Sequence, residues 1–218
     1  MIVAMDGPAG CGKSTIAKLL SQRLGFLYIN SGNIYRAIAW ASIEQAIPLE
    51  SVDTLVALAR ALSIAYESDG SICIGTKCLS AELRSAAVDA IVAQVSAIPE
   101  IRVVVNRIVR NAAENRDAVV EGRDMTTVVF PDAQAKFFID ASVEERAKRR
   151  FMQGSSSFSY EQTLENIKLR DEIDRNKAVG ALKIAPGAVY LDTSGLTIEQ
   201  VYEKVNSKIL HLRDGHGE

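Results

Sequence analysis

The sequence predicts an α/β domain built on a doubly wound, mostly parallel sheet, with a small antiparallel insert and a helical lid. Three observations support this class. Short apolar runs of the kind found in buried parallel strands alternate with segments of helical periodicity along most of the chain. A glycine-rich stretch links the first apolar run to the first helical segment. Only residues 64–79 break the alternation, with short strands separated by turns.

The first segments form a βαβ start. Residues 2–5 are a short apolar run that leads into the glycine-rich stretch at 7–15. Apolar residues then recur at helical spacing over 14–24, and residues 27–29 form a second short strand. Ser31-Gly32 opens the next helix.

The middle of the chain contains the insert and two helices. Within 64–79, turns are expected at Asp69-Gly70 and at Gly75, which favours short antiparallel strands. Helical stretches follow over 80–98 and over 99–114, with Pro99 acceptable in a first helical turn.

Three further strands and three helix starts complete the prediction. The strands are 118–120, 135–140 and 188–191. Capping boxes mark helix starts at Ser142 with Glu145, Ser159 with Gln162 and Thr197 with Gln200. The serine-rich segment 153–157 is predicted to be a mobile loop.

The composition allows one sizeable core and no large basic surface. The chain has 218 residues, 48% of them hydrophobic, and a formal net charge of −2 at pH 7. Such a balance argues against a protein that coats nucleic acid or anionic membrane. With no basic leader and no apolar run as long as a membrane span, we expect a cytoplasmic monomer that acts on small molecules.

The cysteines are expected to be thiols. Cys11, Cys73 and Cys78 are odd in number and have no ligand-rich neighbours in the sequence. We therefore expect a reducing compartment and no structural metal, with Cys73 and Cys78 as core filler in their strands.

The glycine-rich stretch carries a phosphate-binding motif. Residues 7–14 match G-x-x-x-x-G-K-[ST] between a predicted strand and a predicted helix, the context that the motif requires. Its glycines let successive amides converge on phosphate oxygens at a helix N-terminus. We expect ATP at this loop, Lys13 at its β and γ phosphates and Mg²⁺ on the Ser14 hydroxyl. The residues assigned to ATP are Gly7, Pro8, Ala9, Gly10, Cys11, Gly12, Lys13, Ser14 and Thr15. A glycine-rich turn without a ligand is the alternative.

Arginines recur where burial without an anion would be costly. Arg123-Asp124 follows a predicted strand, at the sheet edge where ligands collect in open α/β folds. Basic residues on both sides of the serine-rich segment could form a lid that closes over phosphates. They are Arg146, Lys148, Arg149 and Arg150 before it, and Lys168, Arg170, Arg175 and Lys177 after it. The alternatives are a solvated helix face and, for Arg123-Asp124, a surface ion pair.

Five segments together resemble the bacterial cytidylate kinases, which belong to the P-loop nucleoside monophosphate kinases. They are GPAGCGKST at 7–15, SGNIYRA at 31–37, EGRDMTTVVFPDA at 121–133, DASVEERAKRR at 140–150 and RDEIDRNKAV at 170–179. The resemblance implies a single kinase domain that transfers the γ-phosphoryl group of MgATP to CMP or dCMP. Its core would comprise 1–63, 99–145 and 178–218, its monophosphate-binding region about 31–98 and its lid about 146–177.

The resemblance also assigns roles to single residues. Lys13, Arg146, Arg149 and Arg170 would be catalytic. The acceptor nucleotide would contact Ser31, Gly32, Tyr35, Arg36, Arg102, Gly122, Arg123, Asp124, Arg170, Asp174 and Lys177. Magnesium would be held through Ser14.

Several residues depart from the family pattern. Asn30, Glu121 and Thr126 stand where Asp, Asp and Gly are usual. Ala93 replaces a serine that often reaches the cytosine amino group, and Lys177 replaces an arginine, which could weaken base selectivity and phosphate grip. Ser96, one helical turn from Ala93, could compensate.

Two other functions are compatible with the motif. One is a kinase for another acceptor, such as AMP, UMP or a small metabolite. The other is a P-loop module that binds a nucleotide as a switch without transfer, although a switch has no need of so basic a lid.

Overall fold

The computed structural model describes residues 1–67, 70–153 and 158–214. The turn expected at Asp69 and residues 154–157 of the serine-rich segment lie outside the described residues.

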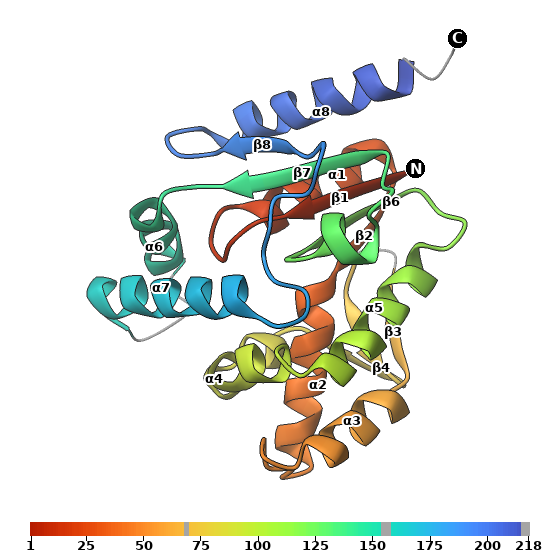
Figure 1. Ribbon diagram of the computed structural model, residues 1–218, viewed down its shortest axis with the longest axis vertical. Helices are drawn as coiled ribbons and strands as arrows, with labels where there is room; N and C mark the ends of the chain where they lie inside the picture. Colours follow the sequence, from red (N-terminus) through yellow and green to blue (C-terminus); the bar gives the residue numbers. More distant parts are fainter. Residues whose placement is uncertain (68–69, 154–157, 215–218) are drawn as a thin grey trace.

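A five-stranded parallel sheet, in the order β2-β6-β1-β7-β8, forms the centre of the molecule (Figure 1). Its strands are β1 (Ile2–Asp6), β2 (Leu27–Asn30), β6 (Ala118–Gly122), β7 (Ala135–Asp140) and β8 (Val189–Asp192). β1 lies in the middle, where Val3 is in register with Val119 on one side and Ala135 on the other. The chain therefore returns to both sides of its first strand only after about half of its length.

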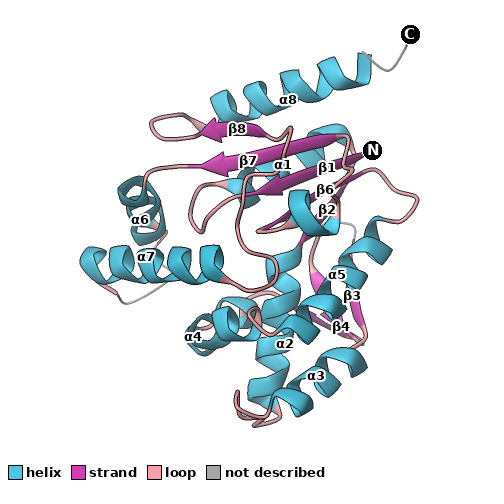
Figure 2. Ribbon diagram, viewed as in Figure 1, coloured by secondary structure: helices cyan, strands magenta, loops and turns pink. Residues whose placement is uncertain are grey.

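Helices cover both faces of this sheet, so the predicted doubly wound α/β class is confirmed (Figure 2). On one face, α1 (Lys13–Leu24) and α8 (Ile198–Asp214) share a core with Val3 and Met5. On the other face, α2 (Ser31–Glu44) and α5 (Pro99–Ala113) share a second core with Ala4. Successive side chains of a strand point to opposite faces, so one apolar run supplies both cores.

Six further helical segments lie in the described part of the chain. They are α3 (Val52–Ala61), the short η1 (Glu82–Arg84), α4 (Ala86–Val95), the π-helical turn η2 (Met125–Val129), α6 (Val143–Met152) and α7 (Tyr160–Asn176). The single helix expected over 80–98 is thus replaced by η1 and a shorter α4. Ser85 separates the two, and its side chain caps α4 by accepting from the Val88 amide.

Two of the three predicted capping boxes are complete, those at Ser159 and Thr197. At Ser142 the hydroxyl accepts from the Glu145 amide, but the Glu145 carboxylate accepts from Arg149 instead of returning to the helix start. All three residues mark the helix starts that the sequence predicted.

The antiparallel insert is confirmed, and Cys73 is buried as expected, but the two cysteines are not free thiols. Strands β3 (Ile64–Tyr66), β4 (Ile72–Ile74) and β5 (Lys77–Leu79) form a separate antiparallel sheet. Its register places Cys73 opposite Cys78, and a disulfide joins them. Because the two thiols meet across neighbouring strands, they form a covalent cross-link, and the Cys78 residue is exposed rather than core filler.

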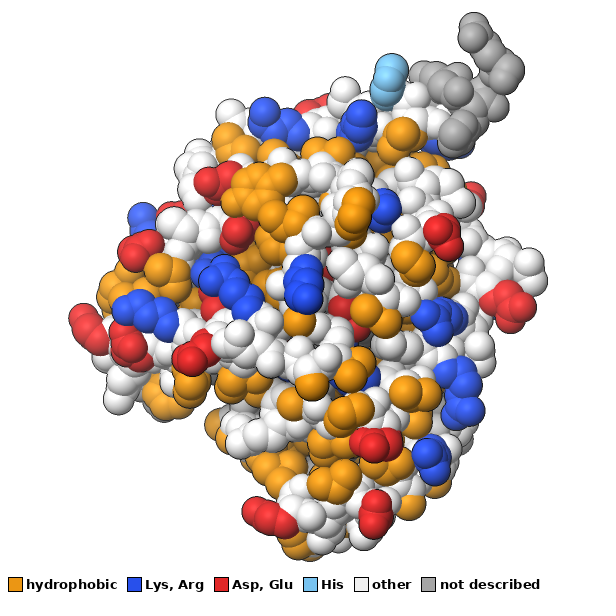
Figure 3. Space-filling view, in the orientation of Figure 1, with side chains coloured by type: hydrophobic (Ala, Val, Ile, Leu, Met, Phe, Trp, Pro, Cys, Tyr) orange, Lys and Arg blue, Asp and Glu red, His pale blue; other side chains and the backbone are white. Residues whose placement is uncertain are grey.

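The visible surface carries mixed charge. Lys and Arg side chains lie among Asp and Glu side chains on the face drawn in Figure 3, as the near-neutral net charge leads one to expect. Within the described residues, none of the helices combines the length and the apolar character needed to span a membrane.

Candidate active site

The phosphate loop connects β1 to α1 as the motif predicts. Gly7 has φ of 149°, and a Cβ there would collide with the Ile139 carbonyl oxygen of β7, so only glycine fits. Gly12, with φ of 94°, stands immediately before α1. The loop is thereby held against the sheet with the positive end of the α1 dipole behind it.

Lys13, the first residue of α1, is held inside this loop. Its side-chain Nζ donates to the Pro8 carbonyl at 3.0 Å and lies 3.5 Å from the Cys11 Sγ. The residue is 5% exposed, and burial lowers the pKa of its ammonium. No carboxylate pairs with it among the described residues, so the charge remains available to an anion.

The carboxyl ends of the strands open into one cavity that joins this loop to the helices beyond. Fourteen of the residues assigned from the sequence line it: Ala9, Gly10, Lys13, Ser14, Gly32, Tyr35, Arg36, Arg102, Gly122, Arg123, Asp124, Arg170, Asp174 and Lys177. They come from five elements and the segments that join them, which explains why sequence spacing alone cannot show that they meet.

Arg102 and Asp124 form a buried ion pair at the wall of the cavity. Nη2 of Arg102 lies 2.5 Å from Oδ2 of Asp124, and the side chains are 2% and 3% exposed. The Arg102 guanidinium lies 5.6 Å from the centre of the Tyr35 ring. A buried pair of this kind is expensive to break, so its place is well defined.

Asp174 near the end of α7 is held by two cations. Its Oδ2 accepts from Nε of Arg123 and its Oδ1 from Nζ of Lys177, both at 2.7 Å. Burial alone would raise the pKa of this carboxyl, but Arg123, Lys177 and Arg170 hold it well below its usual value.

Arg36 extends from α2 and is anchored on two sides. Nη1 donates to the Leu83 carbonyl at 2.8 Å and Nη2 to the Asp89 carboxylate at 2.6 Å. Asp89 also accepts from Arg150 at 3.4 Å. Asp89 was absent from the predicted site, although it lies one helical turn from Ala93, whose importance the resemblance indicated.

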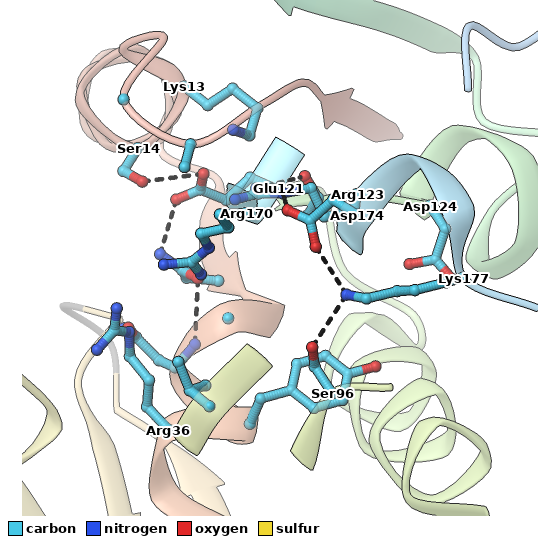
Figure 4. A pocket seen from close by; sticks show the side chains of 18 of the residues that line it. Lys13, Ser14, Arg36, Ser96, Glu121, Arg123, Asp124, Arg170, Asp174 and Lys177 are labelled. Carbon is cyan, nitrogen blue, oxygen red and sulfur yellow. Dashed lines mark hydrogen bonds and ion pairs between the residues drawn. The ribbon is translucent and has the colours of Figure 1, made fainter. Parts of the chain in front are cut away.

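Arg170, in contrast, has no hydrogen bond or ion pair with any described residue, and its Nε is buried without a partner. It lines the cavity with Arg36, and both side chains extend into the same region (Figure 4). Burial and the neighbouring Arg123 lower the pKa of Arg170 to about 10. A guanidinium in this state is stabilised by any anion that enters.

Hard oxygen ligands lie beside the phosphate loop. The Ser14 hydroxyl donates to Oε2 of Glu121 at 3.0 Å, and Oε1 of Glu121 accepts from Asn30 Nδ2 at 2.8 Å and from the Tyr28 hydroxyl. Glu121 is 3% exposed. A hydroxyl next to a buried carboxylate is a donor set that suits Mg²⁺.

Two of the predicted catalytic arginines lie outside the lining of the cavity. Arg146 pairs in bidentate fashion with Asp171, at 3.0 and 2.6 Å, and also donates to the Ala9 carbonyl of the phosphate loop. Arg149 donates to the Cys11 carbonyl and to Thr193. Both arginines therefore hold backbone carbonyls of the phosphate loop in this structure.

The other assigned residues that do not line the cavity are Gly7, Pro8, Cys11, Gly12, Thr15 and Ser31. The structure adds cavity-lining residues that were not in the predicted site: Asn30, Asn33, Arg84, Val92, Ser96, Glu121 and Arg150. The sequence singles out four of these residues for other reasons. Asn30 and Glu121 depart from the family pattern, Ser96 could compensate for Ala93, and Arg150 belongs to the predicted lid.

The fold and the site define an α/β protein of the P-loop kinase class, in which a phosphate loop and a second group of cations share one cavity. Comparison with known proteins then gives the family: the cytidylate kinase family model matches residues 3–211, and the chain belongs to that family.

Individual relatives agree. The chain is 42% identical over 210 residues to a cytidylate kinase of Caldanaerobacter subterraneus subsp. tengcongensis, covering 95% of this chain and 93% of that one. It is 41% identical over 209 residues to a cytidylate kinase of Vibrio cholerae, covering 93% of both. Among solved structures, an uncharacterized protein from Eubacterium ventriosum shares the fold, with a TM-score of 0.53, 11% identity and coverage of 96% and 98%.

Proposed function

We propose that this protein transfers the γ-phosphoryl group of ATP to CMP or dCMP, giving ADP and CDP or dCDP. Family membership supports the reaction type and the acceptor. The observation that carries the proposal is the Arg170 guanidinium, which has no hydrogen-bond or ionic partner among the described residues and shares the cavity with the phosphate loop and with Arg36. A protein that only bound a triphosphate would have no use for a second anion site beyond the loop.

The donor nucleotide would occupy the phosphate loop. Backbone amides of the loop would bind its phosphates, and Lys13 would exchange its contact with the Pro8 carbonyl for a phosphate oxygen. Ser14 would hold Mg²⁺, with Glu121 oriented behind it. When bound, the ion neutralises charge on the phosphoryl group that is transferred.

The acceptor nucleotide would occupy the other half of the cavity. Arg36, Arg123 and Arg170 would bind its monophosphate, and the Arg102 and Asp124 pair would face the base, with Tyr35 beside them. Asp174 and Lys177 would approach the sugar. These residues align the acceptor oxygen with the γ-phosphorus, and alignment with charge neutralisation supplies most of the catalysis in phosphoryl transfer.

The segment of about 146–177 is proposed to be the lid, and the protein to act as a monomer on small molecules. In the present arrangement Arg150 lines the cavity, whereas Arg146 and Arg149 hold the loop. Closure of α6 and α7 over ATP would bring further positive charge to the phosphates.

Steady-state kinetics with CMP, dCMP, UMP and AMP at saturating MgATP test the proposal. We expect CMP and dCMP to be used, and AMP to be rejected by about 10⁴-fold in kcat/KM, because a wrong base leaves buried polar groups unpaired. Preference for AMP would establish the other kinase. Binding of ATP without transfer to any acceptor would establish the switch.

Arg170→Met tests the carrying observation. Loss of a charged contact to the phosphate should lower kcat/KM for CMP by about 10²-fold or more. Arg60→Met, on the exposed side of α3, is the matched control and should leave it unchanged. Equal activity of the two variants would remove the basis of the proposal.

A further inference from the structure

Lys177 directly follows α7, and not all the N–H donors of its ammonium group are engaged within the described part of the protein. Its Nζ donates to Oδ1 of Asp174 at 2.7 Å and to Oγ of Ser96 at 3.0 Å. The side chain is 4% exposed, and the residue lines the cavity. An ammonium carries three N–H donors, so these two contacts leave one donor for a molecule in the cavity.

Ser96 directly follows α4, a helix that contacts α7. Its hydroxyl donates to the Ala93 carbonyl at 2.9 Å, which turns an oxygen lone pair toward Lys177. Its own carbonyl accepts from Nη1 of Arg102 at 2.9 Å. Ser96 therefore contacts both Lys177 and Arg102, and Figure 4 shows its hydrogen bond with Lys177, which also donates to Asp174.

The contact with Ser96 fixes the position of Lys177 Nζ, which Asp174 alone cannot fix. A lysine is a point charge on a flexible stem, and Asp174 lies only three residues earlier on the same helix. That local pair leaves Nζ free to move relative to α4. The hydrogen bond from Lys177 to Ser96 sets the position of Nζ relative to α4 and to Arg102, which itself donates to the Ser96 carbonyl.

We propose that Ser96 is a positioning residue for the acceptor nucleotide: it fixes Lys177 so that the remaining N–H points at an oxygen of the pyrimidine base or of the sugar. The Ser96 proton is already donated to the Ala93 carbonyl, and one lone pair accepts from Lys177, so we assign its effect to the position of Lys177. The inference rests on the proposed function, since it concerns how the acceptor site of that reaction binds its nucleotide.

The test compares Ser96→Val with Ser96→Thr, a matched pair of similar volume that differs in the hydroxyl. Ser96→Val should raise KM for CMP by about five- to tenfold, as expected for one hydrogen bond to a charged group, with KM for ATP unchanged. Ser96→Thr should restore most of the affinity. Ser85→Ala alters the cap at the other end of α4 and should not change KM for CMP, although it lowers the melting temperature.

A double-mutant cycle separates positioning from a structural role. In a Lys177→Met background, Ser96→Val should change KM for CMP by less than about twofold, because the group that Ser96 orients is gone. The same fold-change in both backgrounds, or equal KM values for the Val and Thr variants, would overturn the proposal. Should the Val variant fail to fold, Ser96→Ala and Ser96→Thr give the same comparison.

Two outcomes are kept distinct. A wild-type protein that phosphorylates no cytidine monophosphate contradicts the proposed function. A wild-type protein that does so, with KM insensitive to Ser96, contradicts this inference alone. Within the supporting results, equal losses for CMP and dCMP place the contact on a group that the two nucleotides share, and a loss confined to CMP places it on the 2′-hydroxyl.

Discussion

Lys13 combines deep burial with weak partners. A backbone carbonyl and a sulfur atom are the only hydrogen-bond partners of its ammonium among the described residues, although burial disfavours its charge. A phosphate oxygen is a far better acceptor for an ammonium than either of them. The residue is therefore arranged to gain its strongest interaction from a bound triphosphate.

Lys13→Ala should lower kcat by about 10²- to 10³-fold, or about 3 to 4 kcal/mol, as loss of a preorganised electrostatic partner commonly does. The measurement is turnover with MgATP and CMP. Lys204→Ala, on the exposed side of α8, is the control. Near-normal turnover by a folded Lys13→Ala protein contradicts the assignment.

Asp124→Asn should weaken use of CMP much more than binding of ATP. The change would leave Arg102 buried without its counter-charge, so the wall that we propose to face the base would reorganise. We expect KM for CMP to rise by about 10²-fold and KM for ATP to change by less than about twofold. Asp132→Asn, at an exposed loop residue, should change neither. Equal losses for both substrates would show that Asp124 serves the whole site.

At the scale of elements, the segment that follows α7 packs against the ion pair of Arg102 and Asp124. Gly180 has φ of 67°, and a Cβ at that residue would collide with the Arg102 guanidinium and the Asp124 carboxylate. The segment therefore crosses directly over the ion pair, which is possible only without a side chain. Sequence position gave no hint of this contact, because Gly180 lies far along the chain from both partners.

Gly180→Ala should raise KM for CMP, whereas Gly187→Ala should not. Both glycines have positive φ, so each alanine costs about 1 to 2 kcal/mol of stability from backbone strain. Only at Gly180 does the new methyl group displace the ion pair, because Gly187 has open space around its Cα. Thermal melting measures the shared effect, and kinetics with CMP measures the specific one. Similar KM values for the two variants would contradict this role of the segment.

Elements with a strong local signal could be predicted from the sequence, and those set by distant partners could not. The strand at Ala135–Asp140 was predicted residue for residue, because its apolar run is bounded by turn residues. The π-helical turn was missed, since it depends on the Asp6 carboxylate accepting from the Met125 and Thr126 amides. The disulfide depends likewise on the register of β4 and β5.

The candidate site shows the same division. The phosphate loop is contiguous, so the motif alone placed it. The lid arginines were recognised as a group, but the Asp171 side chain that engages Arg146 comes from another helix and shows no pattern with it. Ionic partners far apart in sequence are decided by packing, so the sequence could not show that Arg146 pairs with Asp171 outside the cavity lining, whereas Arg150 of the same predicted lid lines the cavity.

At the scale of the whole molecule, stability should depend on acid through Asp174. Its pKa is lowered in the folded protein, so ionised Asp174 stabilises the fold above its unfolded value of 3.8, and this contribution is lost as the pH falls toward the folded pKa. Asp174→Asn should be less stable than the wild type at neutral pH, and the difference should shrink as the pH falls below about 4. Urea unfolding at several pH values measures it. A difference that stays constant with pH would contradict the ionic origin.

The central place of β1 also constrains the order in which the chain can fold. Ile2 pairs with Ala118, and Val3 pairs with Ala135, so neither neighbour of the first strand exists until more than half of the polypeptide has been synthesised. The phosphate loop directly follows that strand, so we expect it to fold no earlier than the strand does. During synthesis, the phosphate loop of the nascent chain would remain unfolded and its apolar first strand would remain exposed. Chaperones would have their greatest effect on folding yield during this period.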